Sequence, residues 1–464
     1  MSIAQTTHLS SLARTPLRSV AIVAGLTVLL MVPAFWNAFP LLYYDSLDYI
    51  TMSAIWRMPV YRTGAYGVFA LPARLTGSLW TVIALQSAIC AYVLLEAARR
   101  LVPGLGPARI AAMVLVLLVA TSLPWGTSTF MPDALTGVAI LATLLLALCH
   151  DDLGPVRRWT MVAILSIGSA SHPTHLALLA GLVICMAAMD FMARRGWPFR
   201  PMTVRLVVVG LVIGTLLSAA SNWLMTKRYF LAPQTTAILT LAVLVQDGLA
   251  NRYLEEVCVE PGPGRKPILC PYRHDMPNNA NAFLWHNQDF WDLNGWYGFM
   301  DEAPWMVGEI IRRYPIDFAW TAAKLMAEQL VTLKTGEGLE PMQKFIGEAI
   351  RIFYPWLQRD FLNAYQQTIP DASFLPLDGV NLLHVPAGLL SVVLLGGAVW
   401  RTARRRDTTG LTLAGLALLA YFGNAFICGA ISNPADRYGA RIAWVMTMIA
   451  LMVVPPGSKA GRAE

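Results

Sequence analysis

The sequence predicts an all-α polytopic membrane protein with about ten transmembrane helices. Of its 464 residues, 56% are hydrophobic and only 14% are charged, and the mean hydropathy is +0.52. This composition is typical of chains that lie largely in lipid rather than of soluble domains. The apolar residues also form long stretches with few charges, as expected of helices, because a helix pairs its own backbone groups within a bilayer.

The expected membrane helices can be placed in chain order. They cover residues 20–36, 78–97, 110–123, 134–148, 159–170, 176–191, 206–224, 383–399, 411–431 and 442–454. The first stretch continues through Trp36 into an acidic segment without a small-residue cleavage site. We therefore expect it to remain as a membrane helix rather than to be removed as a signal peptide.

Positive charges lie on one side of these predicted helices. The gaps that we assign to the inner side contain Arg14, Arg18, Arg99, Arg100, Arg109, Arg157, Arg158, Arg194, Arg195, Arg200, Arg205, Arg401, Arg404, Arg405, Arg406, Lys459 and Arg462. The gaps 124–133 and 171–175, on the other side, contain no lysine or arginine. Short cytoplasmic loops are rich in these residues, so we expect a multi-pass protein of the plasma (inner) membrane with both termini in the cytoplasm. The net charge of +7 therefore reflects orientation and does not indicate nucleic-acid binding.

This orientation divides the chain into three parts. Residues 1–226 form an N-terminal transmembrane module with outer loops. Residues 227–381 form an extracytoplasmic section after the seventh helix, and residues 382–464 form the C-terminal transmembrane helices.

The extracytoplasmic section contains several distinct segments. The apolar stretch 235–245 is too short to span a membrane, so it is expected along the membrane surface or packed on the bundle. Aromatic residues in 285–299 indicate either an interfacial aromatic belt or a ligand contact, and 305–333 has the pattern of an amphipathic helix or helix pair. Cys258 and Cys270 are the two cysteines of this section; because the exterior is oxidising, we expect a disulfide between them.

Two carboxylates, Asp45 and Asp48, follow the first predicted helix directly. An ionisable group at the edge of the hydrocarbon is costly and is therefore a candidate functional residue, with a solvated turn as the alternative interpretation. The predicted orientation brings further candidates to the same outer side: Asp133, His172, His175, Asp436, Arg437, Tyr438 and Arg441. The spans themselves contain almost no charge, so this pattern favours a site at one membrane face over a transport path through the bundle.

Common catalytic motifs are absent from the sequence. It contains no glycine-rich phosphate loop, no G-x-S-x-G, no H-E-x-x-H and no C-x-x-C. His172 and His175 have a spacing that a metal site can use, but no acidic residue lies near them in sequence. Structural histidines at a helix end are the alternative. Asp151 and Asp152, beside Arg157 in an inner gap, are interpreted as a solvated turn.

Four short segments on the expected outer side form a recognisable set. They are Tyr43-Tyr-Asp-Ser-Leu-Asp-Tyr49, Arg57-Met-Pro-Val-Tyr61, Met131-Pro-Asp133 and Asp436-Arg-Tyr438. Together with the large outer section after helix seven, this set resembles the GT-C superfamily of membrane glycosyltransferases. That superfamily includes the protein O-mannosyltransferases and the bacterial lipid A aminoarabinose transferases.

The resemblance rests on single positions. Asp45 and Tyr49 match an acidic motif after helix one that has a tyrosine four positions on, and Asp133 matches an acidic residue of the second outer loop. The segment that ends at Tyr61 resembles the following proline and tyrosine segment of the family, and Asp436-Arg-Tyr438 resembles a basic segment at an outer helix end in some members. Ser46 stands where many members carry a second acid, so either Asp48 takes that place or the role is absent.

The resemblance implies a GT-C-type glycosyltransferase of the cell envelope that moves a sugar from a polyprenyl-phosphate donor. Independently of it, Asp45 is suited to take the proton from an acceptor hydroxyl, with Asp133 and Asp48 as further catalytic candidates. Arg437 and Arg441, with Tyr438, are expected to bind the donor phosphate. Asp133 is also a candidate to hold the acceptor or a divalent metal ion, although no cofactor is certain. Further substrate-binding candidates are Tyr49, Arg57, Tyr61, His172 and His175.

The expected partners are the lipid bilayer, the polyprenyl-phosphate sugar and a glycan, lipid or protein acceptor. Two other functions fit a membrane protein of this composition. A lipid or oligosaccharide transporter would place polar residues or broken helices at mid-membrane in paired halves, and the sequence has neither. A non-catalytic membrane assembly factor would keep its activity when Asp45 is replaced.

Overall fold

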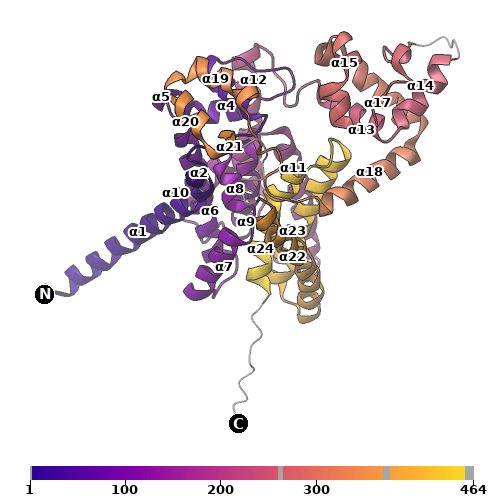
Figure 1. Cartoon of the computed structure of the whole chain (residues 1–464). Helices are drawn as coiled ribbons and strands as arrows, with labels where there is room; N and C mark the ends of the chain where they lie inside the picture. The colour runs from indigo at the N-terminus through magenta and orange to yellow at the C-terminus, as the bar shows by residue number, and fades with distance from the viewer. Residues whose placement is uncertain (1–2, 260–264, 369–376, 455–464) are drawn as a thin grey trace.

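The computed structural model describes residues 3–259, 265–368 and 377–454, with side chains from residue 17 onward. Helices make up 76% of the structure, and these described ranges contain no strand. Figure 1 shows a helix bundle with a smaller helical lobe beside its upper end. The all-helical prediction is therefore confirmed.

Five helical stretches are long and apolar enough to cross a membrane. They are α6 (Trp80–Arg100), α11 (Pro173–Arg194), α12 (Arg205–Thr226), α22 (Leu377–Arg405) and the run Thr408–Ala430, made of α23 (Thr408–Ala425) and the π-helical turn η6 (Phe426–Ala430). Each of them coincides with one of the predicted spans. The described structure therefore supports the membrane character of the chain.

The other predicted spans also form helices, but these are shorter or more polar. They are α1 (Ile3–Leu30) with α2 (Val32–Trp36), α7 (Pro107–Val119), α9 (Thr136–Leu148), α10 (Pro155–Ala170) and α24 (Asp436–Val453). Every residue of α9 and most residues of α24 are buried, so these two helices lie inside the bundle. The count of about ten spans stays a prediction.

A glycine contact holds α24 closely against α9. Gly137 of α9 lies so near to the ring of Trp444 that any larger side chain at position 137 would collide with that ring. Small residues allow this kind of close approach between helices in membrane bundles. The contact fixes the helix that carries Arg437 and Arg441 beside the helix that follows Asp133.

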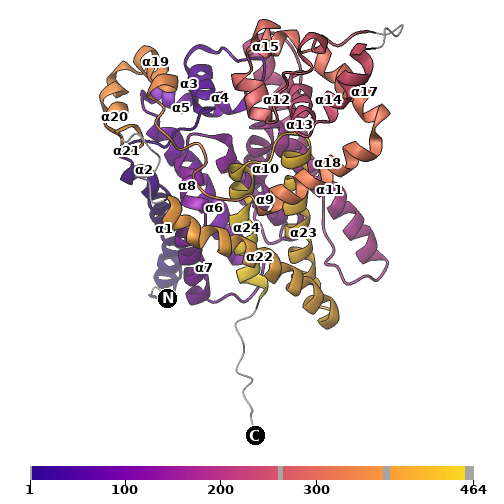
Figure 2. The ribbon, with the colours of Figure 1, turned by 45° about the vertical axis from the view of Figure 1, so that its right-hand side comes forward.

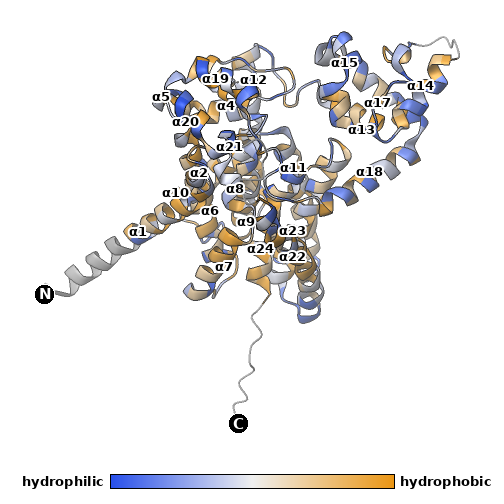
Figure 3. Cartoon of the chain, viewed as in Figure 1, coloured by the Kyte–Doolittle hydropathy of each residue, from blue (hydrophilic) through white to orange (hydrophobic). Residues whose placement is uncertain are grey.

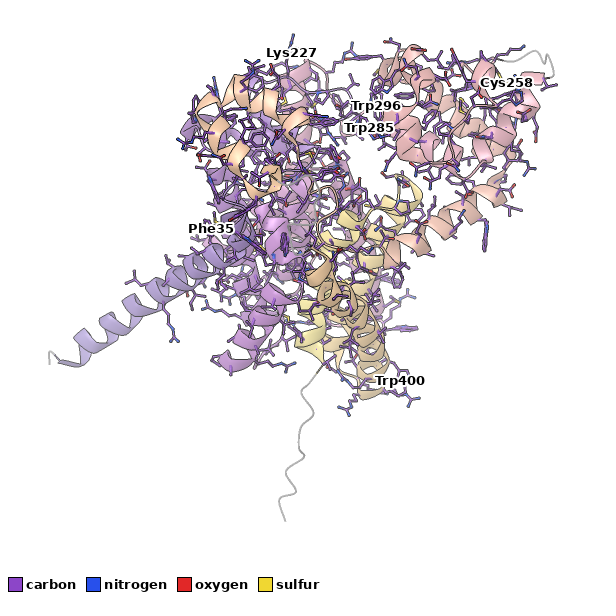
Figure 4. All side chains as sticks on the ribbon, in the orientation of Figure 1. Phe35, Lys227, Cys258, Trp285, Trp296 and Trp400 are labelled. Atoms are coloured by element: carbon purple, nitrogen blue, oxygen red, sulfur yellow. A yellow bond between two sulfur atoms is a disulfide. The ribbon has the colours of Figure 1, made fainter. Side chains whose placement is uncertain are left out.

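Several arginines of the predicted inner gaps bond backbone carbonyls at the lower end of the bundle. Arg100 donates to the carbonyl of Asp152 at 3.1 Å, and Arg401 donates to the carbonyl at the end of α24 at 2.7 Å. Figure 4 shows Trp400 at this end and Cys258 at the opposite end. Arg401 thereby supplies a partner to a carbonyl that the end of α24 leaves free, and Arg100 fastens the turn after α9.

The predicted extracytoplasmic section packs as two separate units. The first unit, which we call the lobe, contains α13 (Thr236–Gln246), α14 (Leu249–Val259), η2 (Cys270–Tyr272), the π-helical turn η3 (Ala282–His286), α15 (Gln288–Asp292), α16 (Gly295–Gly298), α17 (Glu302–Arg313) and α18 (Pro315–Val331). Figure 3 shows mixed hydrophilic and hydrophobic colour over the lobe, in contrast to the mainly hydrophobic helices of the lower bundle. The 305–333 region is thus the helix pair α17 and α18.

The short apolar helix α13 forms the core of the lobe. Its residues from Thr240 to Val245 are buried in a cluster that includes Phe283, Phe290 and Phe299. α14, α17 and the aromatic segment enclose most of this helix, so it is a core helix of the lobe rather than a surface helix. The expected packing on the bundle is present at one contact, where Thr240 donates a hydrogen bond to the carbonyl of Ile431 at 2.8 Å. A disulfide joins Cys258 of α14 to Cys270 of η2.

The second unit returns to the N-terminal module. It contains α19 (Gln343–Phe353), η4 (Pro355–Leu357), α20 (Gln358–Asn363) and α21 (Tyr365–Thr368), and it lies against α3 (Ser46–Ile55), close to α4 (Ala65–Phe69) and α5 (Leu71–Thr76), as Figure 2 shows. The amide of Gln366 bonds both backbone groups of Leu42, at 3.0 and 2.6 Å. The outer section therefore fixes the chain just before the acidic segment.

Candidate functional site

Two outer loops of the N-terminal module are fastened together beneath the charged residues. Leu41 forms an isolated parallel bridge with Thr129, which lies between α8 (Leu123–Ser128) and η1 (Pro132–Leu135). Ser46 is fully buried and donates a hydrogen bond to the carbonyl of Phe130 at 2.9 Å. Ser46 therefore joins the loops at the position where the GT-C pattern has a second acid.

Arg62 connects the two carboxylates of the acidic segment. Its Nη2 pairs with Oδ1 of Asp45, and its Nε donates to Oδ2 of Asp48 at 2.8 Å. Asp48 lies in the first turn of α3, and Asp45 is the residue before that helix, so the start of the helix places both carboxylates within reach. Arg57, the predicted arginine of this segment, is exposed and forms no ion pair in the described part of the chain. Arg62 is thus the arginine that pairs with these carboxylates, and the substrate contact expected of Arg57 stays a prediction.

Arg437 brings the last helix to the same carboxylate. Its Nη1 donates to Oδ2 of Asp45 at 2.9 Å, and its Nη2 donates to the hydroxyl of Tyr438 at 2.9 Å. The guanidinium also lies over the ring of Tyr43, 4.5 Å from its centre. Its Nε is buried without a hydrogen-bond partner among the described residues. The ion pair of Asp45 and Arg437, named here the loop pair, therefore keeps one unused donor.

A glycine-flanked glutamate caps the start of α24. Oε2 of Glu337 accepts from the backbone amide of Arg437 at 2.7 Å. Gly336 and Gly338 have φ of +95° and +66°, values that favour glycine, and a side chain at position 338 would collide with Tyr43. Glu337 was not among the predicted site residues, and the Gly-Glu-Gly pattern is the sequence signal that could have indicated it.

A second ion pair lies one turn further into the bundle. Nη1 of Arg441 donates to Oδ1 of Asp133 at 2.7 Å, and we call these residues the bundle pair. The remaining nitrogens of Arg441 contact Oδ1 of Asn424 at 2.9 and 3.2 Å, Sγ of Cys428 at 3.0 Å and Oγ1 of Thr174 at 3.3 Å. Arg441 is therefore fully occupied by protein groups, so a phosphate would have to displace one of these contacts, and its phosphate-binding role stays a prediction.

The two predicted histidines flank the bundle pair but bond to neutral groups. His175 is buried between the hydroxyl of Thr136 at 2.6 Å and the carbonyl of Gly168 at 3.0 Å. His172 caps α11 through Thr174, the residue that also contacts Arg441. These contacts favour the structural interpretation of both histidines.

Burial and arginine contacts move the carboxyl groups of the outer loops in different directions. Burial raises the pKa of Asp45, but Arg62 and Arg437 outweigh that effect and hold the pKa below its ordinary value. For Asp48, burial outweighs the effect of Arg62, its one cationic neighbour among the described residues, and the pKa is raised. Burial likewise raises the pKa of Glu337. Of these three carboxyl groups, Asp45 is therefore the one that stays ionised most readily.

A pocket adjoins both ion pairs. Its charged end contains Asp133, Glu337, Arg437 and Arg441, whereas Asp45 is not part of the lining. The remaining lining is mainly apolar and includes Leu123, Trp125, Met131 and Trp444. The pocket therefore combines charged groups at one end with walls suited to a hydrocarbon chain.

The two predicted tyrosines of the acidic region have different surroundings. Tyr49 is buried, with its ring 4.8 Å from that of Tyr66, so it belongs to the packing beneath the site. Tyr61 contacts the lobe instead, with its ring 5.0 Å from that of Trp296. Only Tyr61 is therefore placed where a substrate could meet it.

The part of the chain that the structure describes contains no group of three or more His, Cys, Asp and Glu side chains arranged to hold a metal ion. Arginines pair with Asp45, Asp48 and Asp133. Comparison with protein-family models, curated proteins and solved structures gives no match to this chain. Its function therefore has to be inferred from the geometry and chemistry of this site.

Proposed function

We propose that the protein is a GT-C-type glycosyltransferase that moves a sugar from a polyprenyl-phosphate donor to an acceptor hydroxyl. The observation that carries this proposal is the pocket, where Arg437 meets mainly apolar walls. A ligand that fits both parts has an anionic head and a hydrocarbon chain. A polyprenyl phosphate has this structure, and its sugar would extend toward Asp45.

Arg437 is the group that binds the donor phosphate. Its unpartnered Nε leaves a buried donor for a phosphate oxygen, and its charge offsets the negative charge that grows on the phosphate as the sugar leaves. Contacts of this type typically stabilise a transition state by about 2–4 kcal/mol. Arg441 holds Asp133 in place and supports the same pocket wall from the bundle.

Asp45 accepts the proton of the acceptor hydroxyl. The acceptor oxygen forms a bond to the anomeric carbon, the bond from that carbon to the phosphate oxygen breaks, and its electron pair leaves with the phosphate. Because the pKa of Asp45 is held low by Arg62 and Arg437, the carboxylate is ionised before the reaction but weakly basic. Phosphate binding draws Arg437 away from Asp45 and makes the carboxylate a stronger base.

The remaining carboxylates have supporting roles in this proposal. Asp133 faces the pocket and positions the sugar or the acceptor while Arg441 neutralises its charge. Asp48 orients Arg62, which in turn holds Asp45. We therefore rank the loss of transfer on change to asparagine as greatest for Asp45, smaller for Asp133 and least for Asp48.

The proposed reaction takes place on the outer face of the inner membrane. The disulfide between Cys258 and Cys270 provides a test of this orientation. After reduction, an impermeant thiol reagent should label both cysteines in spheroplasts of intact inner membrane, and it should not label them before reduction. Labelling that requires broken membranes would place the site on the cytoplasmic face.

The function is tested by transfer from defined donors. Membranes containing the wild-type chain or Asp45→Asn are incubated with radiolabelled mannose, glucose or aminoarabinose on polyprenyl phosphate, and label in non-donor products is measured. The wild type should transfer label from at least one donor, and Asp45→Asn should transfer none while folding normally. Equal labelling with both proteins, or donor depletion that matches empty membranes, would refute the proposal.

A further inference from the structure

Three aromatic residues form a surface where the lobe meets the acidic segment. The ring of Tyr61 lies 6.0 Å from that of Trp285 and 5.0 Å from that of Trp296, and the two tryptophan rings are 5.4 Å apart. We call these residues the aromatic platform. Figure 4 shows Trp285 and Trp296 together on the side of the lobe that faces the bundle.

Two features of the platform are not explained by packing: the exposure of Trp285 and the indole N–H of Trp296, unpaired in the described part of the chain. Trp285 is 43% exposed. It lies within the π-helical turn η3, and this irregular geometry is frequent at functional sites. Trp296 is 5% exposed, and its indole N–H has no hydrogen-bond partner among the described residues. Buried donors are nearly always paired, so this N–H indicates a missing acceptor from a ligand.

Arg62 connects the platform to the loop pair. Its guanidinium carbon lies 5.2 Å from the centre of the Tyr61 ring, and the same guanidinium pairs with Asp45 and Asp48. A ligand on the platform would therefore lie beside the proposed base. This position is separate from the pocket proposed for the donor, whose lining includes none of the three platform residues.

We propose that the aromatic platform binds a saccharide of the acceptor, which makes the acceptor of the proposed transferase a glycan. The C–H faces of a pyranose are weakly positive and pack on the negative face of an aromatic ring. Its hydroxyls can accept from the indole N–H of Trp296. Calling the saccharide an acceptor rests on the proposed transferase function. Binding of the saccharide itself can be measured without any donor.

Trp291 provides a matched control for Trp285. It is 44% exposed and belongs to the same lobe, but its ring packs on Phe290 and has no described contact with Tyr61. Removing either ring should therefore cost the lobe a similar contact with its core. Only the loss of Trp285 should change binding on the platform.

The experiment uses the full chain in nanodiscs and saturation-transfer NMR with mannotetraose, cellotetraose and chitotetraose. At least one tetrasaccharide should bind to the wild type. Trp285→Ala should weaken that binding about tenfold, Trp285→Phe should weaken it less, and Trp291→Ala should leave it unchanged. Bromine-labelled lipids should quench the fluorescence of the wild type and of Trp285→Phe equally, because the ring lies outside the bilayer.

Several outcomes would overturn the inference. They are no binding of any tetrasaccharide, equal losses in Trp285→Ala and Trp291→Ala, or quenching that Trp285→Phe removes, which would make Trp285 an interfacial anchor. If saccharide binds through Trp285 while no donor is turned over, the platform stands and the transferase proposal fails. If transfer proceeds with the same acceptor KM in Trp285→Ala, the transferase stands and the platform fails.

Discussion

The loop pair and the bundle pair are both built from an aspartate and an arginine of α24, but their surroundings differ. The side chain of Arg437 is 20% exposed and that of Arg441 is 2% exposed. Arg437 shares Asp45 with Arg62, and its Nε has no hydrogen-bond partner in the described parts of the chain. Arg441 has all its nitrogens in contact with protein groups.

This difference separates a replaceable contact from a fixed one. When a phosphate approaches Arg437, Asp45 keeps Arg62 as a partner, so the exchange leaves no carboxylate unpaired. If a ligand drew Arg441 away, Asp133 would lose its ion-pair partner, and an unpaired buried charge is costly. One turn of α24 therefore separates the arginine suited to a ligand from the arginine that maintains the bundle.

The largest effect is expected from Arg441→Ala. The change leaves the carboxylate of Asp133 without its partner, which typically costs about 3–5 kcal/mol when a buried pair is broken. Yield and the apparent melting temperature in detergent should fall strongly. The double variant Asp133→Asn/Arg441→Gln removes both charges and should recover much of the loss. Normal stability of Arg441→Ala would abolish the distinction between the two pairs.

Arg437→Ala should affect catalysis more than folding. Loss of one charge-assisted phosphate contact of about 2–4 kcal/mol lowers turnover by about a hundredfold or more. The melting temperature should fall less than in Arg441→Ala, because Asp45 retains Arg62. Arg401→Ala is the control, since the guanidinium of Arg401 bonds a carbonyl at the other end of α24 and is not part of the pocket lining. Unchanged donor turnover in Arg437→Ala would contradict the assignment.

A smaller effect concerns the pH dependence of stability at Asp45 and Asp48. The lowered pKa of Asp45 gives stability that is present above its ordinary value of 3.8 and is lost as pH falls below it. The raised pKa of Asp48 has the opposite effect: the stability that Asp48 contributes is lost as pH rises from 3.8 through the pKa of the folded state. Melting curves from about pH 3 to pH 7 should therefore show that Asp45→Asn removes acid sensitivity and Asp48→Asn removes a loss toward neutral pH. If both variants changed the slope of melting temperature against pH in the same direction, the two carboxylates would have similar environments.

The sequence predicts the helices of this fold well because the signal for each helix is local. Apolar runs and flanking charges suffice to locate α6, α11, α12, α22 and α23. The burial of α13 could not be predicted in this way, since an apolar stretch of 11 residues looks the same on a surface and in a core. What decides its place is contact with aromatic residues from a distant segment.

The sequence predicted most residues of the candidate site but not which of them form ion pairs with each other. Asp45 and Arg437 are 392 positions apart, and no local pattern specifies that they meet. Arg62 was not among the predicted site residues, because only the folded chain shows which guanidinium reaches the carboxylates. The different states of Arg437 and Arg441 depend on Asn424 and Cys428, which the sequence presents as ordinary helix residues.

Asp45→Asn tests most directly the claim that Asp45 competes with a donor phosphate for Arg437. The measurement is binding of sugar-free polyprenyl phosphate to the wild type and to Asp45→Asn in nanodiscs, alongside transfer from the sugar-bearing donor. The variant should bind the phosphate more tightly, by about threefold or more, because a competing negative charge is gone, and it should transfer no sugar. Weaker phosphate binding together with normal transfer would contradict both the competition at Arg437 and the role of Asp45 as the base.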